Sequence, residues 1–201
     1  MSKSKTILAW HWSDGLKCQY DSRPIVSGET LVYEGEEPIK LCKRGLHAST
    51  RILHAIRYAV GNTISRVRLS GEIIRGEDKI VATHRTCLWS FDATYTLITW
   101  AADCAERALL RERKAGREPD PRCFAEIEAA RKFVKDPTEE NRDAARECHC
   151  TPGTAGYVAW AAWDNRCAAN WASLAASSAA LLVGEYQTAA YEKERKWQSA
   201  R

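Results

Sequence analysis

The sequence predicts an α+β protein in two parts: a small strand-rich, basic α/β domain over residues 1–91 and an all-α helical bundle, rich in alanine and tryptophan, over residues 92–201. Alanine marks the division, because only 5 alanines lie in the first part and 25 lie in the second. Alternation of apolar and polar residues in the first part is typical of strands, and a spacing of three to four residues in the second is typical of helices. The ordinary balance of apolar and charged residues excludes a disordered or collagen-like chain.

The first elements of the strand-rich part are short and separated by turn signals. A strand over residues 6–12 is followed by a short strand within residues 28–35, which begins and ends with glycine. Residues 38–42 then lead into the turn Lys43-Arg44-Gly45. The β-branched and aromatic residues favour strands, and the glycines favour chain reversal.

One helix is expected in this part, over residues 52–60. Ser49 and Thr50 are suited to cap its first turn, because their hydroxyls can accept hydrogen bonds from free backbone N–H groups. Gly61-Asn62 is predicted to end the helix in a left-handed conformation, which glycine adopts at little cost.

Three strands should follow this helix. In the first, over residues 63–70, the apolar positions alternate with arginine, so that Arg66 and Arg68 share one face and Val67 lies on the other. The second and third, over residues 71–76 and 79–89, are joined by a polar turn at Gly76-Glu77-Asp78.

The second part is predicted to contain helices and no strand. Asp120-Pro121 supplies an N-cap and a first-turn proline, and Thr138 supplies another N-cap. The expected helices cover residues 92–114, 121–134, 139–150, 157–183 and 185–201.

The longest expected helix, over residues 157–183, carries a repeating large side chain every three or four residues. This face consists of Trp160, Trp163, Cys167, Trp171, Leu174, Ser178 and Leu181. Core packing is the favoured role of these tryptophans, with alanines allowing close approach of neighbouring helices. The same face could instead close a homo-oligomer.

Positive charge is concentrated between Lys40 and Arg85, where 10 basic side chains are opposed by 3 acidic ones. Such a segment favours an anionic partner, because arginine binds phosphate oxygens in pairs and aromatic rings stack on bases. A solvated arginine surface is the alternative. The candidate ligand-binding residues are Trp10, His11, Trp12, His47, Ser49, Thr50, Arg51, Arg57, Tyr58, Arg66 and Arg68. His47 has a simpler alternative role, which is to hydrogen-bond the backbone of its own turn.

Two stretches resemble known families. The segment KLCKRGLHAST, followed by GEIIRGEDKIVAT, resembles an uncharacterised domain of phage and prophage proteins. In the second part, WAADCAERAL, DPRCFAEIEAARKFV and AWAAWDNRCAANWA are similar to a helical family of immunity proteins. These resemblances imply a phage or prophage origin and action in the cytoplasm of a bacterial host.

The function expected from these features is that of a non-catalytic protein which sequesters a nucleotide-like ligand and thereby antagonises host-defence signalling. A second hypothesis is an enzyme that uses NAD, since the order of motifs is similar to the ADP-ribosyltransferase fold, with His11, Ser49, Thr50, Tyr58 and Glu72 in its functional positions. Glu72 lacks the acidic or glutamine partner two residues earlier that this fold provides. A third hypothesis is an immunity or interaction module whose helical domain binds a host-defence protein.

No metal, cofactor or catalytic residue is predicted. Cys148-His149-Cys150 and the pair Cys42 and His47 contain zinc-binding atoms, but the first set lacks a clear second pair, and two cysteines two positions apart on a helix point about 200° apart. Reduced cysteines are expected, because the first residues resemble no signal peptide. The weakly hydrophobic run from Cys167 to Gly184 is expected to be a buried helix and not a membrane span.

Overall fold

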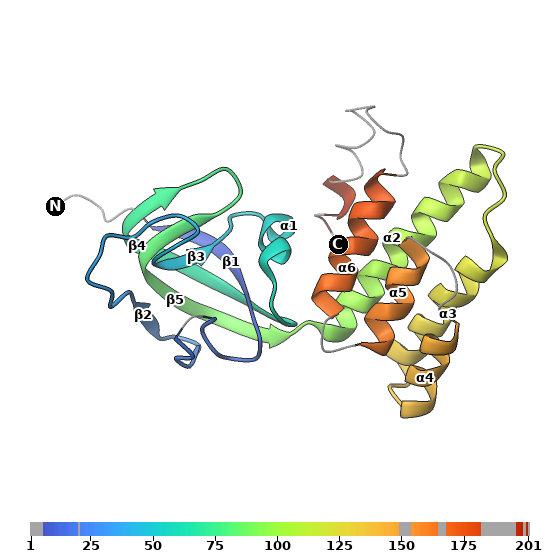
Figure 1. Cartoon of the computed structure of the whole chain (residues 1–201), viewed down its shortest axis with the longest axis horizontal. Helices are drawn as coiled ribbons and strands as arrows, with labels where there is room; N and C mark the ends of the chain where they lie inside the picture. The colour runs from blue at the N-terminus through green and yellow to red at the C-terminus, as the bar shows by residue number, and fades with distance from the viewer. Residues whose placement is uncertain are drawn as a thin grey trace. The chain divides into compact units, whose positions relative to one another are not determined.

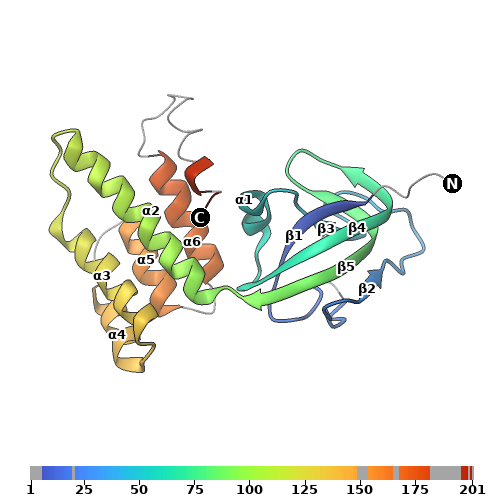
Figure 2. The ribbon, with the colours of Figure 1, turned by 180° about the vertical axis from the view of Figure 1, so that it is seen from behind.

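A computed structural model describes residues 6–19, 21–148, 154–164, 168–181, 196–198 and 200. The chain divides into two compact units, Met1–Ala93 and Thr94–Arg201, which we call unit 1 and unit 2. Unit 1 contains a five-stranded antiparallel sheet, and the described part of unit 2 contains helices (Figures 1 and 2). The protein is therefore of the mixed α+β class, as the sequence predicts.

The sheet of unit 1 is built around a long hairpin of two strands. Strand β4 pairs with β5 on one side and with β1 on the other, and β2 and β3 both pair with the free edge of β5. The strands cover Ile7–Ser13 (β1), Thr30–Val32 (β2), Leu46–Ala48 (β3), Thr63–Arg75 (β4) and Ile80–Asp92 (β5). Strands β2 and β3 contain only three residues each, so most of the chain between β1 and β4 forms loops. Several of these loops border the candidate site.

A backbone bridge joins the segment after β3 to the first strand, β1, and so closes the sheet on itself. Ser49, directly after β3, exchanges hydrogen bonds with Trp10 of β1, with N–O distances of 2.7 and 2.9 Å. Because β3 is also paired with β5, β1 and β5 are joined on both sides and enclose an apolar core. The core cluster contains Ile7, Ala9, Ala48, Val67, Leu69, Ile80 and Ala82.

Two of the expected strands are one strand in the structure. Strand β4 runs through both, and the pairing with β5 shifts between Ser70 and Ile73. Gly71 has a φ of +76°, which glycine adopts readily, so the predicted break is a β-bulge within a continuous strand.

The helix expected over residues 52–60 is much shorter. The α-helix α1 covers Ile52–Ala55 and is followed by a 3₁₀ turn, η1, over Ile56–Tyr58. The capping prediction is wrong, because the N-cap is Arg51, without a side-chain bond, and Ser49 is held by the bridge to β1. The left-handed end at Gly61 is also wrong. Glycine is needed there because a Cβ would lie 2.7 Å from Cα of Asp14.

The helices of unit 2 begin close to the predicted signals. They cover Thr94–Lys114 (α2), Pro121–Lys135 (α3), Glu139–Glu147 (α4), Thr154–Trp163 (α5) and Ala168–Leu181 (α6). Both predicted caps are confirmed: Asp120 accepts a bond from the N–H of Arg122, and Thr138 accepts one from the N–H of Asn141. The start expected at Asp92 is corrected, because Asp92 is still paired in β5.

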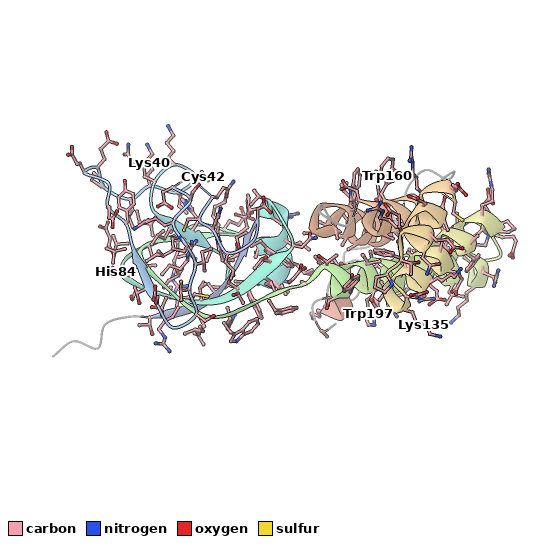
Figure 3. The ribbon with its side chains drawn as sticks, turned by 90° about the horizontal axis from the view of Figure 1, so that it is seen from below. Lys40, Cys42, His84, Lys135, Trp160 and Trp197 are labelled. Carbon is pink, nitrogen blue, oxygen red and sulfur yellow. The ribbon has the colours of Figure 1, made fainter. Side chains whose placement is uncertain are left out.

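The single helix expected over residues 157–183 is instead the separate helices α5 and α6, which pack against each other. Trp160 and Trp171 therefore do not share a helix face. Their rings stack across the two helices, with centroids 5.4 Å apart, and Figure 3 shows Trp160 on its helix. On α6 the buried positions are alanines, whereas Leu174 is 38% exposed. The side chains of Trp163, Cys167 and Leu181, and most of the helix expected over residues 185–201, lie outside the described residues.

Candidate functional site

Two adjoining pockets in unit 1 share His11 and His47 as lining residues. The larger pocket has a volume of about 590 Å³ and is bordered by β1, the loops after β1 and β2, the 43–47 turn and Arg85 of β5. The smaller pocket has a volume of about 170 Å³ and is bordered by β1, the end of β3 and the α1–η1 segment. The first is within the range of roughly 300–1,000 Å³ typical of small-molecule sites.

Arg85 is a buried cation in the wall of the larger pocket. It is paired with Leu69 of β4 and so faces the core side of the sheet, where only 4% of its surface is exposed. Its guanidinium donates to Nδ1 of His11 at 3.2 Å, to the carbonyl of His47 at 2.9 Å and to Sγ of Cys18 at 3.1 Å. All three partners are neutral acceptors. Burial lowers the pKa of Arg85, and the nearby charge of Asp21 opposes this shift. Arginine remains protonated in proteins, so the pocket contains a positive charge whose hydrogen bonds all go to neutral groups, while Asp21 is itself paired with Arg23.

His11 is held as a neutral donor by this arrangement. Because arginine can only donate, Nδ1 of His11 must accept, and the ring proton is then on Nε2. Burial, with the charge of Arg85 and the nearby His47, lowers the pKa of His11 well below its usual value. Nε2 of His11 and Nε1 of Trp12 are both buried without an acceptor among the described residues. Both residues line the smaller pocket.

His47 organises the turn that separates the pockets. Its Nδ1 is bonded to the carbonyl of Gly45 at 3.0 Å, and its Nε2 accepts from the N–H of Cys42 at 3.0 Å. Burial lowers the pKa of His47, which matches the neutral ring that an accepting Nε2 requires. Gly45 has a φ of +105°, and a Cβ there would lie 2.5 Å from Cγ2 of Val81. The simpler role expected for His47 is confirmed, since both ring nitrogens are bonded within the turn.

The rim of the larger pocket carries more positive than negative side chains. Arg23, Lys43 and Arg44 join Arg85 in the lining, against Asp21 and Glu34. Arg23 forms ion pairs with both carboxylates, at 2.7 Å to Asp21 and 3.1 Å to Glu34. The two acids are therefore already bound to a cation. Arg44 is in turn ion-paired with Glu37, so the lining cations without an ion pair to any described residue are Arg85 and Lys43.

The smaller pocket is bordered by the ring of Tyr58, which interacts with Asp78 and with Lys79. Tyr58 donates to Asp78 at 2.5 Å, and Nζ of Lys79 lies 3.6 Å from the centroid of the tyrosine ring. The bond to Asp78 raises the pKa of Tyr58, so the phenol is neutral. Cys42, also in this lining, is labelled in Figure 3 beside Lys40 on the loop before β3.

The structure brings together only part of the predicted ligand-binding set. Trp10, His11, Trp12, His47, Ser49 and Tyr58 line one or both pockets. Five others line neither pocket: Thr50, Arg51, Arg57, Arg66 and Arg68. The two strand arginines alternate along β4 with Val67 and Leu69 of the core, so they lie on the opposite side of the sheet from Arg85 and the larger pocket. Trp10 pairs with Arg66 but lies on β1, where it lines the smaller pocket. Arg57 is exposed on η1, and Arg51 is exposed at the N-cap of α1.

Arg85 is the site residue that sequence reasoning placed in the basic segment but not in the site. The alternation of β5 contains the signal, because Arg85 and Cys87 are two residues apart and both are buried. Cys18, Arg23 and Lys79 reach the pockets from loops, for which the sequence has no periodic signal.

Glu72 lies outside both pockets and is exposed. Its backbone N–H donates to the hydroxyl of Thr83 at 3.1 Å, next to the bulge in β4. Glu72 therefore does not supply a carboxylate to the pockets that contain His11, and the two carboxylates that line the larger pocket, Asp21 and Glu34, are paired with Arg23.

Within the described residues, no group of three or more His, Cys, Asp or Glu side chains is placed to hold a metal ion. His149 and Cys150 of the Cys-His-Cys motif lie outside those residues. Among the helices that the structure describes, none is long and apolar enough to cross a membrane.

No protein-family model matches this chain, and no curated protein or solved structure is similar to it at a significant level. The pockets of unit 1 are therefore the basis on which a function can be argued.

Proposed function

We propose that unit 1 binds an anionic, nucleotide-like small molecule in the larger pocket and sequesters it without turnover. The observation that carries this proposal is Arg85, a buried guanidinium bonded to three neutral acceptors. Burial of an ion away from water costs on the order of several kcal/mol, and an opposite charge bonded to the ion offsets this cost. A phosphate in the pocket would supply that opposite charge.

The adjoining pocket suits the rest of such a ligand. Trp10 and Tyr58 offer ring surface for a base, and the unsatisfied N–H groups of His11 and Trp12 offer donors to its carbonyl or ring nitrogen atoms. On the rim, Lys43 provides further positive charge, while Arg44 is ion-paired with Glu37.

Binding is favoured over catalysis by the state of the titratable groups. Asp21 and Glu34 are both paired with Arg23, and both ring nitrogens of His47 are used within its turn. His11 is neutral and accepts a bond from Arg85. These contacts do not leave an evident base beside a nucleophile.

The resemblance of the first part to a phage and prophage domain supports a biological setting for this binding. The role that we propose is antagonism of a host defence through capture of its signalling nucleotide in the bacterial cytoplasm. Unit 2 is proposed to be an alanine- and tryptophan-rich bundle that carries unit 1. Its described helices bury many alanines at 0–2% exposure, which supports this assignment.

The proposal is tested by isothermal titration of the full chain with inorganic phosphate, mononucleotides, cyclic dinucleotides and NAD. We expect binding of at least one nucleotide, and chromatography of the released ligand should recover it unchanged. Arg85→Met should weaken binding at least about 30-fold, because losing one partner of a buried charge pair typically costs about 2–5 kcal/mol.

Arg68→Met is the matched control, since Arg68 is an exposed arginine of the same sheet that lines neither pocket. Its affinity for the small ligand should stay within about twofold of the unchanged chain. Absence of binding to every ligand, or equal losses in the two variants, would contradict the proposal. Recovery of a chemically changed ligand would show turnover, and it would contradict sequestration in favour of an enzymatic function.

A further inference from the structure

The side of the sheet opposite Arg85 presents aromatic and cationic side chains in register. Three cross-strand rows define this surface, which we call the outer face: Leu8–Arg68–Thr86, Trp10–Arg66–Trp89 and Trp12–Ile64–Phe91. None of these nine residues is acidic. The third row is partly covered, since Trp12 and Ile64 are buried, but Phe91 is 46% exposed.

The aromatic rings of the outer face form a connected group. Trp10 and Trp89 meet edge to face, with centroids 5.7 Å apart, and Trp89 and Phe91 are tilted, with centroids 5.9 Å apart. The guanidinium carbon of Arg66 lies 4.5 Å from the centroid of Trp10. Trp89 is 43% exposed and Leu8 is 50% exposed, so large apolar surface lies beside fixed positive charge.

We propose that the outer face binds single-stranded nucleic acid, with bases stacked on Trp89 and Phe91 and the backbone phosphates near Arg66 and Arg68. Aromatic rings on a sheet can stack on unpaired bases of any sequence, and guanidinium groups attract the phosphates between them. A duplex is disfavoured, because its bases are stacked on each other. A second copy of this chain would bring its own Arg66 and Arg68 to the same interface, which adds like charge.

The charge of unit 1 supports a polyanionic partner. Residues 1–91 carry 14 basic and 9 acidic side chains, and the outer rows contribute two arginines without a carboxylate. Trp10 and Trp12 of the outer face also line the smaller pocket, but Trp89, Phe91, Arg66 and Arg68, on which the inference rests, line neither pocket. The inference therefore goes beyond the proposed small-ligand function.

Fluorescence anisotropy of the full chain with labelled oligothymidine and oligouridine of about 12 nucleotides tests the inference. We expect binding that weakens between about 50 and about 200 mM salt, as phosphate contacts require. Trp89→Ala and Arg68→Glu should each reduce affinity about tenfold, through loss of stacking and through reversed charge. Arg68→Glu changes an exposed side chain, so it keeps the test decisive if Trp89→Ala does not fold.

Two controls separate this surface from the pockets. Leu16→Ala removes another exposed apolar side chain, 51% exposed and outside the three rows, and should leave oligonucleotide affinity unchanged. Arg85→Met should also leave it unchanged while weakening small-ligand binding at least about 30-fold. The inference is overturned if no oligonucleotide binds, if both outer-face variants bind as the unchanged chain does, or if a duplex binds equally well.

Discussion

Arg85 of unit 1 and Arg131 of unit 2 each contact several side chains, but the charges of their partners differ. Arg131 joins α3 to α2 through bonds to Glu106 at 2.7 Å and Asp103 at 3.3 Å, and it also bonds Glu128 at 3.3 Å. The hydrogen-bond partners of Arg85 are all neutral, although Arg85 is the more buried of the two, and Asp21 acts on its charge without an ion pair between them. Bonds to Glu106 raise the pKa of Arg131, whereas burial lowers that of Arg85.

The difference separates a structural cation from one suited to a ligand. The charge of Arg131 is neutralised within the fold, so its contacts serve to hold two helices together. Arg85 stays charged although its burial away from water is unfavourable, and a pocket lies beside it. A buried cation beside a pocket with no carboxylate bonded to it is a physical indication of a site, because an anionic ligand can supply that bond from outside the protein.

The largest expected difference between the units arises on acidification. Burial lowers the pKa values of His11 and His47 below the usual 6.5, so below that pH the unfolded chain binds protons that native unit 1 resists. The stability of unit 1 is thus fully present above pH 6.5 and falls as the pH drops. In unit 2 the bond to Arg131 lowers the pKa of Glu106 below its usual 4.5, so the corresponding loss begins only below that value.

Hydrogen exchange of the full chain at about pH 7.5 and about pH 5.5, corrected for the pH dependence of intrinsic exchange, tests this prediction. Protection in β1, β4 and β5 should fall at the lower pH while protection in α2 and α3 is kept. His11→Gln should reduce the loss in unit 1, and His84→Gln, a change in the same sheet away from both pockets, should not. Equal losses in the two units would contradict the assignment of neutral, buried histidines.

A smaller difference is expected when each arginine is replaced by methionine, which keeps its length without its charge. Arg131→Met should lower the free energy of opening α2 and α3 by about 1–2 kcal/mol, because three carboxylates lose a half-exposed partner. Arg85→Met should change the stability of unit 1 by less than about 1 kcal/mol, because removal of a costly buried charge offsets the loss of the three hydrogen bonds that Arg85 donates. Hydrogen exchange measures both values. A larger loss from Arg85→Met than from Arg131→Met would assign Arg85 to the fold instead of the pocket.

The sequence was most informative where local chemistry determines structure. The caps at Asp120 and Thr138 and the alternation around Val67 were predicted because each depends on neighbouring residues. The division of residues 157–183 into two helices was not predictable from periodicity, since an alanine-rich segment has a weak amphipathic pattern. The bulge at Gly71 is a similar case, because glycine marks a strand break and a bulge equally well.

The candidate site was predictable only in part, for a related reason. His11 and Trp12 could be found because an aromatic-histidine cluster on a strand stands out, and Ser49 because it follows the GLHA turn. Which side of the sheet each arginine faces depends on register, and register fixes Arg66 on the outer face and Arg85 on the inner one. The sequence alone could not rank these two arginines.

The smallest predicted difference concerns the helix caps of the two units. Asp120→Ala and Thr138→Ala should each lower the free energy of opening of the helix that follows by about 1 kcal/mol, because each side chain accepts a bond from a free N–H of the first turn. Thr50→Ala is the matched change in unit 1, where α1 begins at Arg51 without a side-chain cap bond and Thr50 is exposed. Its effect should stay within about 0.5 kcal/mol. Hydrogen exchange of α1, α3 and α4 measures all three, and a loss at Thr50 as large as that at Thr138 would contradict the absence of a side-chain cap at α1.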